Sequence, residues 1–429
     1  MKIITLPEKE RWEELCRRPE IDRNYLDNVV RDIINSVKSE KDKAVYSYSE
    51  KFDGVLTGTL KVTSDEIRES IRKIPQELKN AIDTAKKNIE KFHSAQLIPE
   101  PVLETSKGVR CWRKGVAIEK VGLYIPGGSA PLFSTLLMLG IPAKLAGCNE
   151  IIICTPAGKD GKVSPLILFT AQLIGITEIF KAGGAQAIAA MAYGTESIPK
   201  VYKIFGPGNQ YVTKAKELVQ QDGIAIDMPA GPSEVLVIAD NRANPEFIAA
   251  DLLSQAEHGP DSQVIMLTDD RILLEKVRYE VDKQVDLLPR KEIALNALEN
   301  SKLILLTSLN ACIDFSNLYS PEHLIINITD PGSVANKIIN AGSVFLGDFS
   351  CESAGDYASG TNHTLPTNGF AKNYSGVSTE SFLKKISFQE ISAEGIKNLG
   401  PTIELMAEAE SLIGHKNAVS LRIKSLENG

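Results

Sequence analysis

Histidine is the side chain most suited to chemistry in this sequence, because the chain has only five and four of them interrupt apolar surroundings. These four lie in short polar segments that also carry an amide or a carboxylate: Ser254–Pro260, Ser320–Leu324, Gly355–His363 and Glu410–His415. Imidazole binds metals and exchanges protons near neutral pH. The segments are therefore candidates for a metal site or for acid–base catalysis.

The first two segments offer different chemistry. Gln255 and His258 are three residues apart at the end of a predicted helix, so they share one face and can offer an amide oxygen and an imidazole to one cation. Alternatively, His258 only caps the helix C-terminus. Glu322 and His323 stand side by side before a predicted strand, as an acid–base pair would. An ordinary loop pair is the alternative.

The third and fourth segments add further candidate ligands. Asp356 and His363 lie in a Gly-rich stretch, where Asp356 can bind a metal and His363 a metal or a substrate; a turn with local side-chain bonds is the alternative. His415 follows Glu410 on a helical pattern, which is otherwise a solvated helix end. Together the four segments supply an amide, an Asp and two or three His, a mixed set that suits Zn²⁺ or a similar divalent ion.

Three Gly-rich turns follow predicted strands and begin helices, where backbone N–H groups can approach an anionic ligand. None matches Gly-x-Gly-x-x-Gly, so the usual dinucleotide fingerprint is absent and plain strand–helix turns are the alternative. The turns are Leu123–Gly128, Gly183–Gln186 and Gly206–Asn209.

The elements that must position these residues alternate between strand and helix from Gly115 onward. Such alternation predicts βαβ units with parallel sheets. We infer two α/β units with a crossing near Ala230–Pro232, preceded by an arm and a helical layer over residues 8–105. The predicted strands are Ile151–Cys154, Glu178–Ala182, Val201–Phe205, Val235–Ala239, Gln263–Thr268, Leu303–Thr307, Leu324–Ile328 and Ser343–Leu346. The predicted helices are Ala81–His93, Val163–Leu173, Ala185–Tyr193, Asn209–Gln220, Pro245–Glu257, Ile272–Asp286, Ser333–Asn340 and Thr402–Leu412, the last in a helical tail.

Composition excludes several classes of protein. The 429 residues are 43% hydrophobic and 24% charged, which is the balance of a globular chain. A net charge of −7 argues against nucleic acid as a partner, since phosphate binding needs clustered Lys and Arg. We expect no secretory signal and no membrane span, because no apolar stretch is long enough. Six scattered Cys without a Cys-x-x-Cys pair indicate reduced cytoplasmic thiols and no Cys-type zinc site.

The motifs, taken in order, resemble those of the histidinol dehydrogenase family over nearly the whole chain, from about Asn28 to the tail. They are Gly122–Gly128, Gly183–Gln186, Gly206–Asn209, Gly231-Pro232-Ser233-Glu234, Ser254–Gly259, Pro321-Glu322-His323, Gly355–His363 and Glu410–His415.

The resemblance implies a role for each candidate residue. It makes Glu322 and His323 the catalytic pair. The implied zinc ligands are Gln255, His258, Asp356 and His415. The implied substrate contacts are Ser233, Gln255, His258, His323, Asp356, His363, Glu410 and His415, and the implied NAD contacts are Tyr124, Gln186 and Asn209.

The resemblance also implies an architecture and a reaction. The fold would be α/β, with two incomplete Rossmann-like parallel-sheet domains, an N-terminal helical arm and a C-terminal helical tail. The expected division is an arm over 1–25, a first domain over 26–124 and 235–377, a second over 125–234 and a tail over 378–429. A homodimer with exchanged tails would oxidise histidinol to histidine through the aldehyde, with one zinc per subunit and two NAD consumed.

Two other functions fit parts of the pattern. A zinc hydrolase on an α/β scaffold is one, although its usual His-Glu-x-x-His signature is absent. A non-enzymatic metal-binding module is the other, but it would need neither the adjacent Glu322 and His323 nor the Gly-rich turns. Reduction of NAD by histidinol would exclude both.

Overall fold

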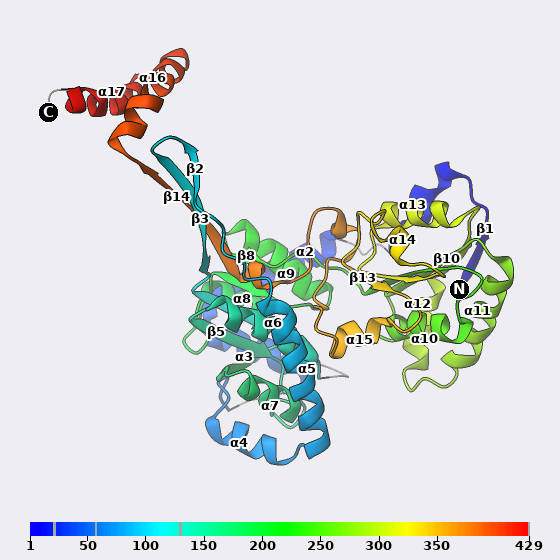
Figure 1. Ribbon diagram of the computed structural model, residues 1–429. Helices are drawn as coiled ribbons and strands as arrows, with labels where there is room; N and C mark the ends of the chain where they lie inside the picture. Colours follow the sequence, from blue (N-terminus) through cyan, green and yellow to red (C-terminus); the bar gives the residue numbers. More distant parts are fainter. Residues whose placement is uncertain (20–22, 56–57, 128–130, 428–429) are drawn as a thin grey trace.

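The computed structural model describes residues 1–19, 23–55, 58–127 and 131–427. Figure 1 shows two α/β units side by side and an arm that carries the C-terminal helices away from both. A parallel sheet forms the centre of each unit, whereas the sheet of the arm is antiparallel. The two parallel-sheet units confirm the predicted fold class.

The first unit is built on a six-stranded sheet with the order β1-β11-β10-β9-β12-β13. Val237 of the central strand β9 lies in register between Met266 of β10 and Ile325 of β12. The three central strands are buried along their whole length, as expected where helices cover both faces of a parallel sheet. The strands are β1 (Lys2–Thr5), β9 (Glu234–Ala239), β10 (Gln263–Thr268), β11 (Lys302–Leu305), β12 (His323–Asn327) and β13 (Ser343–Leu346).

Alternate strand side chains of this unit point into two helical layers, because successive residues of a strand face opposite sides. Val235 and Val237 pack in a cluster with α10, α11 and α12, and Leu236 and Ile238 pack with α1, α13 and α14. The helices are η1 (Lys9–Arg11), α1 (Trp12–Leu15), α10 (Pro245–Ala256), α11 (Arg271–Val285), α12 (Lys291–Glu299), α13 (Leu309–Tyr319), α14 (Gly332–Ala335) and α15 (Glu352–Tyr357).

The second unit is built on a five-stranded parallel sheet with the order β6-β5-β4-β7-β8. One buried cluster joins this sheet to α2, α3, α8 and α9, and another joins it to α4, α5, α6 and α7. The strands are β4 (Lys120–Tyr124), β5 (Glu150–Thr155), β6 (Glu178–Lys181), β7 (Lys203–Phe205) and β8 (Ala225–Ile226). The helices are α2 (Arg23–Glu40), α3 (Asp42–Asp53), α4 (Ser64–Arg72), α5 (Gln76–Ser94), α6 (Phe133–Ala146), α7 (Pro165–Leu173), α8 (Gly184–Tyr193) and α9 (Gln210–Gln221).

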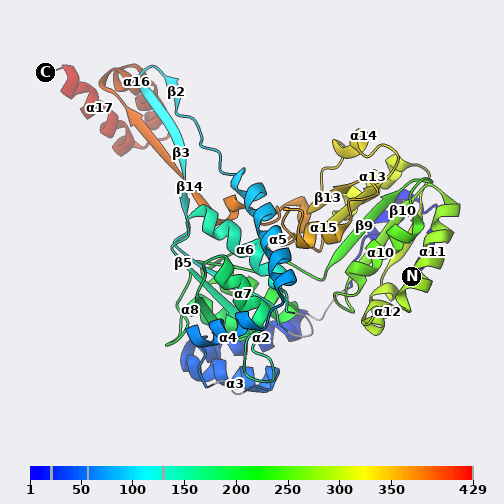
Figure 2. The same ribbon diagram turned by 60° about the horizontal axis from the view of Figure 1, so that its bottom comes forward.

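The arm is a three-stranded antiparallel sheet in which β3 (Val109–Ala117) pairs with both β2 (Leu103–Ser106) and β14 (Leu383–Ile391). Trp112 of β3 lies opposite Phe388 of β14, and their rings stack with centroids 5.4 Å apart. Beyond the strands, α16 (Ala393–Ala409) and α17 (Ile413–Glu427) pack against each other at the far end of the arm, as both views show (Figures 1 and 2). Two short turns, η2 (Phe370–Lys372) and η3 (Thr379–Phe382), precede β14.

Most predicted elements are present, with small shifts at their ends, but several expectations differ from the structure. The helix predicted over Thr402–Leu412 spans Ala393–Ala409. The helix predicted over Ser333–Asn340 spans only Gly332–Ala335. Residues 378–429 are not purely helical, since β14 crosses them. Residues 2–5 form an edge strand of the six-stranded sheet instead of a helical arm.

The grouping of the N-terminal third also differs from the expected division. Residues 26–124 were expected to share a domain with 235–377. Instead α2, α3 and α5 pack on the five-stranded unit, because their apolar faces meet α8, α9 and α6. Among the described residues, no helix is long and apolar enough to cross a membrane.

Candidate active site

Glu322 and His323 lie where β12 begins, beside the start of β9. The backbone N–H of Glu234 donates to Glu322 Oε2 at 2.8 Å. His323 Nδ1 is 3.2 Å from the Glu234 carbonyl oxygen, 3.5 Å from Glu322 Oε2 and 2.9 Å from Gln255 Nε2. Both side chains are buried. The predicted acid–base pair is therefore held at the amino edge of the six-stranded sheet.

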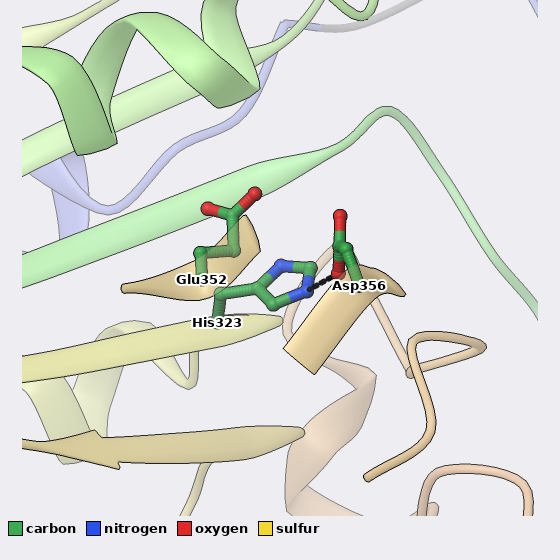
Figure 3. A group of neighbouring side chains, drawn as sticks. All are labelled: His323, Glu352 and Asp356. Atoms are coloured by element: carbon green, nitrogen blue, oxygen red, sulfur yellow. Dashed lines mark ion pairs between the residues drawn. The ribbon is translucent and has the colours of Figure 1, made fainter. Parts of the chain in front are cut away.

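Three carboxyl groups surround the ring of His323. Its Nε2 is 3.4 Å from Asp356 Oδ1, and Figure 3 shows the ring between Asp356 and Glu352. These two acids are four residues apart on the short helix α15, so both face the ring. Burial by itself would lower the pKa of His323, but the negative charges of Glu322, Glu352 and Asp356 outweigh it and raise the pKa well above its usual value.

The pKa values of the three neighbouring acids shift in opposite directions. Burial raises the pKa of Glu322 and raises that of Glu352 further, although the positive ring of His323 opposes the rise in both. For Asp356, burial is outweighed by His323, which holds the pKa of this carboxyl below its usual value. The site therefore keeps Asp356 ionised and favours a proton on Glu352.

Gln255 and His258 are brought to the same place by the end of α10. This helix ends at Ala256, so His258 lies in the turn that follows and not on the helix itself. Gln255 is almost fully buried, whereas His258 is exposed. Loss of hydration lowers the pKa of His258, with Asp356 opposing this shift and His323 and His363 adding to it. His258 is therefore close enough to Asp356 for the charge of that carboxyl to act on its ring.

His363 links the two α/β units. Its Nδ1 is 2.9 Å from the carbonyl oxygen of Asp356, and its Nε2 is 3.0 Å from the hydroxyl of Thr135 on α6. Burial lowers the pKa of this ring, against the pull of Asp356. Ser233 is half-buried and directly precedes β9. Both predicted substrate contacts thus border the catalytic pair.

Several buried polar atoms at the site have no hydrogen-bond partner among the described residues: Gln255 Oε1, His323 Nε2, Glu352 Oε2 and Asp356 Oδ1, although His323 Nε2 and Asp356 Oδ1 face each other as an ion pair at 3.4 Å. Orphaned polar atoms at such a depth are costly unless a ligand satisfies them. Potential metal-binding atoms of His323, Glu352 and Asp356 all lie within 4.8 Å of one another. This set shares only Asp356 with the zinc ligands that the sequence implies.

The Gly-rich turns lie at the carboxyl edge of the five-stranded sheet, where open α/β sheets bind ligands. Tyr124 ends β4, and its hydroxyl oxygen accepts a hydrogen bond from the Gly184 N–H at 3.1 Å. Gln186 in the first turn of α8 is buried, and neither polar atom of its amide has a hydrogen-bond partner in the part of the chain that the structure describes. Asn209 caps α9 through Oδ1. The predicted turn residue Gly128 lies outside the described residues.

A buried ion pair stabilises the third Gly-rich turn, Gly206–Asn209. Lys216 of α9 contacts Asp227, and their side chains are 3% and 1% exposed. Lys216 donates to the Gly206 carbonyl oxygen at 2.9 Å, while Asp227 Oδ2 accepts from the Gly206 N–H at 2.8 Å. Gly206 has φ +129°, and a Cβ there would lie 2.1 Å from the Tyr124 carbonyl oxygen. Only glycine fits this position.

Glu410 and His415 are not at this site within one chain. Both are exposed on the helical pair at the end of the arm, which projects away from the six-stranded unit (Figures 1 and 2). The structure therefore brings together Gln255, Asp356, Glu322 and His323, with His258 in the same electrostatic surroundings, and leaves the tail residues apart.

Sequence reasoning missed several residues that shape the site. The spacing of Glu352 and Asp356 on one helical face was a readable pattern. Glu234 belongs to the motif Gly231-Pro232-Ser233-Glu234, but the sequence alone assigns it no role. Nothing in the local sequence pointed to Arg18 or Thr135, because their partners are 216 and 228 residues away. Lys216 and Asp227 are closer in the chain, but only the fold brings α9 against the segment after β8.

Comparisons with known proteins agree over the whole chain. The family model described as histidinol dehydrogenase matches residues 16–423. The histidinol dehydrogenase of Bacteroides thetaiotaomicron is 60% identical over 427 residues, covering 100% of both chains. That of Escherichia coli is 52% identical over 421 residues, covering 97% of this chain and 96% of the relative. A crystal structure of the enzyme from Elizabethkingia anophelis is 58% identical with a TM-score of 0.97, covering 100% of this chain and 99% of that one. The chain therefore belongs to the histidinol dehydrogenase family of oxidoreductases.

Proposed function

We propose that this protein oxidises L-histidinol to L-histidine through L-histidinaldehyde, the last two steps of histidine biosynthesis, with one zinc ion per subunit and two NAD consumed per histidinol. The single observation that carries the proposal is the buried Glu322–His323 pair beside the Asp356 carboxyl and Gln255 Oε1, which has no hydrogen-bond partner among the described residues. Family membership supplies the substrate, since the relatives are named for oxidising histidinol.

The residues at the site fit a zinc ion. Gln255 Oε1 is buried with no hydrogen-bond partner among the described residues, Asp356 Oδ1 is buried 3.4 Å from His323 Nε2, and His258 is close enough to Asp356 for its pKa to respond to that charge. With His415 of a second copy these residues form a mixed nitrogen and oxygen set of the kind that Zn²⁺ accepts. When bound, zinc would act as a Lewis acid that fixes the imidazole and amine of histidinol.

His323 is assigned as the base instead of a zinc ligand. Its Nδ1 faces two acceptors, the Glu234 carbonyl oxygen and Glu322 Oε2. The carboxyl groups around the ring raise its pKa, and a cation bound beside the ring would oppose this and favour the neutral form, with the proton on Nδ1 and the lone pair on Nε2. The Gln255 Nε2, which lies 2.9 Å from Nδ1, would then have to turn away. Because Nε2 can bind a metal or take a substrate proton but not both, the base role leaves the metal to the other residues. His323 then accepts the alcohol proton as hydride leaves the carbinol carbon.

Glu322 is assigned to the second half-reaction. The aldehyde must be hydrated before a second hydride can leave, and a carboxylate beside the site can take a proton from water. The Glu234 N–H and the positive ring of His323 both stabilise the ionised form of Glu322 against the effect of burial. Ser233, His363 and the Glu410 of a second copy complete the proposed substrate contacts.

The Gly-rich turns fit NAD. Gln186 offers a buried amide without a partner, and Asn209 keeps Nδ2 available because capping uses only Oδ1. Tyr124 lies between them at the end of β4, and the glycines let backbone approach closely. NAD bound there would accept the hydride. The 3.0 Å contact between His363 and Thr135 ties this edge to the catalytic pair.

The proposed active unit is a homodimer with exchanged tails, working in the cytoplasm. Apolar side chains on the helical pair are widely exposed in one chain: Leu405, Met406, Leu412, Ile413 and Leu421 are between 43% and 69% exposed. Burying such a surface against a second copy is favourable. The same docking would deliver His415 and Glu410 to the neighbouring site.

The test is the number of NADH formed per histidinol. With limiting histidinol and excess NAD, absorbance should rise to two NADH per histidinol. A chelator should abolish the rise while circular dichroism stays unchanged, because a chain of this length buries enough core to fold without a metal. No NADH at any metal loading would refute the proposed function, and one NADH with aldehyde accumulating would refute the second step.

A further inference from the structure

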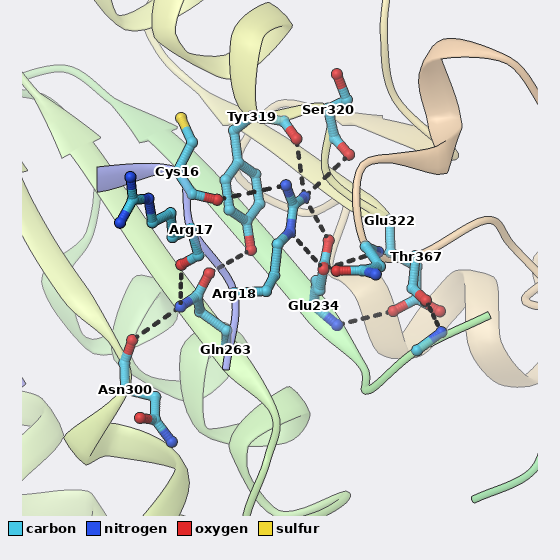
Figure 4. A network of polar contacts seen from close by, with 12 residues as sticks. Cys16, Arg17, Arg18, Glu234, Gln263, Asn300, Tyr319, Ser320, Glu322 and Thr367 are labelled. Carbon is cyan, nitrogen blue, oxygen red and sulfur yellow. Dashed lines mark hydrogen bonds and ion pairs between the residues drawn. The ribbon is translucent and has the colours of Figure 1, made fainter. Parts of the chain in front are cut away.

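Arg18 forms a buried ion pair directly behind the catalytic residues. Its Nε is 2.9 Å from Glu234 Oε1 and its Nη2 is 3.0 Å from Glu234 Oε2 (Figure 4). The two side chains are 13% and 2% exposed. Such a two-pronged contact fixes orientation as well as charge, because the guanidinium plane matches the carboxylate.

The same guanidinium holds the turn that leads into Glu322. Nη2 also donates to the carbonyl oxygens of Tyr319 at 2.8 Å and Ser320 at 3.4 Å. The guanidinium carbon lies 3.8 Å from the centroid of the Tyr319 ring. Ser320 has a φ of +58°, which a non-glycine residue adopts only when its surroundings impose it. Arg18 thus stabilises a strained turn two residues before Glu322.

Glu234 carries this restraint to the catalytic pair. Its side chain is held by Arg18 and by the Asn368 N–H at 2.9 Å, while its backbone N–H donates to Glu322 and its carbonyl oxygen faces His323 Nδ1. Both routes from Arg18, through Glu234 and through the 319–320 turn, end at Glu322.

We propose that Arg18 and Glu234 are positioning residues that orient Glu322 and His323, an inference that rests on the proposed roles of that pair. The N-terminal segment would then be part of the catalytic machinery although it contacts neither substrate nor cofactor. A purely structural anchor would instead lower stability and leave the chemistry of the surviving folded enzyme unchanged.

The experiment is a double-mutant cycle between Arg18→Met and Glu322→Gln, read as kcat for aldehyde oxidation by the zinc-loaded enzyme. Arg18→Met should lower this kcat at least tenfold with little change in the KM for NAD or in zinc content. In the Glu322→Gln background the same change should have almost no effect, because the group that Arg18 orients is already inactive. Arg18→Lys, which keeps the charge but loses the planar fork, should restore part of the rate.

Arg17→Met is the matched control, since the side chain of Arg17 is exposed and its backbone oxygen is the atom that accepts from Gln263 in this network. It should leave kcat unchanged. Glu234→Gln covers the case in which Arg18→Met does not fold, because the amide oxygen can still accept from Arg18 and the charge left unpaired is the more exposed of the two, 13% for Arg18 against 2% for Glu234; it should show the same non-additivity. If Arg18→Met or Glu234→Gln lowered kcat by the same factor in the wild-type and Glu322→Gln enzymes, the positioning role would be overturned. A Glu322→Gln enzyme with normal aldehyde oxidation would instead refute the proposed function of Glu322.

Discussion

Glu322 is a buried carboxyl with one strong backbone donor and one charged neighbour, and these contacts define what its replacement should do. Glu322→Gln keeps the size of the side chain but removes the base for hydration. Aldehyde oxidation should fall by roughly two to four powers of ten, the usual contribution of a general base. Alcohol oxidation should fall much less. Stopped-flow rates measured separately from histidinol and from histidinaldehyde test this, and equal losses in the two would contradict the assignment.

His323 distinguishes between two interpretations of the metal site. In one, His323, Glu352 and Asp356 bind the ion, since their ligand atoms lie within 4.8 Å of one another. In the proposed one, His323 stays free as the base. His323→Asn should therefore abolish alcohol oxidation while the purified enzyme keeps about one zinc per subunit. Metal analysis by mass spectrometry, with His258→Asn as the zinc-deficient control, decides between them; zinc lost from His323→Asn would move this residue into the metal site.

At the residue scale, sequence was most informative where a motif is contiguous. Glu322 and His323 are neighbours in the chain, so their pairing needed no knowledge of the fold. Gln255 and Asp356 are 101 positions apart by their numbers, and they meet only because α10 and α15 pack together. Arg18 was invisible because its partner Glu234 is 216 residues away.

At the element scale, the turn after β7 depends on the Lys216–Asp227 pair. Lys216 donates to the carbonyl oxygen of Gly206, and Asp227 accepts from its N–H. Lys216→Met would leave Asp227 buried without its ion-pair partner. Breaking a buried pair in this way costs about 3–5 kcal/mol of the free energy of unfolding. Release of the turn should also raise the KM for NAD more than the KM for histidinol. Urea unfolding and steady-state kinetics measure the two effects.

A matched control for that prediction is the exposed pair of Lys38 and Asp222, whose side chains are 39% and 46% exposed. Lys38→Met should change the free energy of unfolding by only about 0–1 kcal/mol. Similar losses in the free energy of unfolding from both substitutions would mean that burial does not strengthen the Lys216–Asp227 pair. An unchanged KM for NAD in Lys216→Met would mean that this pair does not support NAD binding at the turn.

The elements that sequence predicted well are those with continuous apolar runs. The buried strands β9, β10 and β12 are of this kind, because helices cover both faces. The arm was missed because β14 is exposed along most of its length and pairs with β3, more than 260 residues earlier. Its apolar residues pack against those of the paired strand and not against a core, so they do not form the apolar pattern by which a buried strand is recognised. The helix predicted over 333–340 stops early after one turn that begins at Gly332, next to Pro331.

At the scale of the whole molecule, the proposed site is not complete within one chain. The amino edge of the six-stranded sheet holds Glu322, His323, Gln255 and Asp356, while His415 and Glu410 are exposed at the end of an arm. An exchanged element makes the two sites of a symmetric dimer equivalent. The central claim is that each site is completed by the tail of the second chain.

Complementation between two inactive chains tests this claim most directly. His258→Asn and His415→Asn should each give an inactive homodimer. In a mixed dimer with exchanged tails, one site collects both lesions and the other has none. Random assembly makes half the dimers mixed, so co-expression with two tags should restore about a quarter of the wild-type activity. Purified mixed dimers should have about half of the wild-type activity. If the tail folds back on its own chain, each site keeps one lesion, and a silent mixed dimer would contradict the shared site.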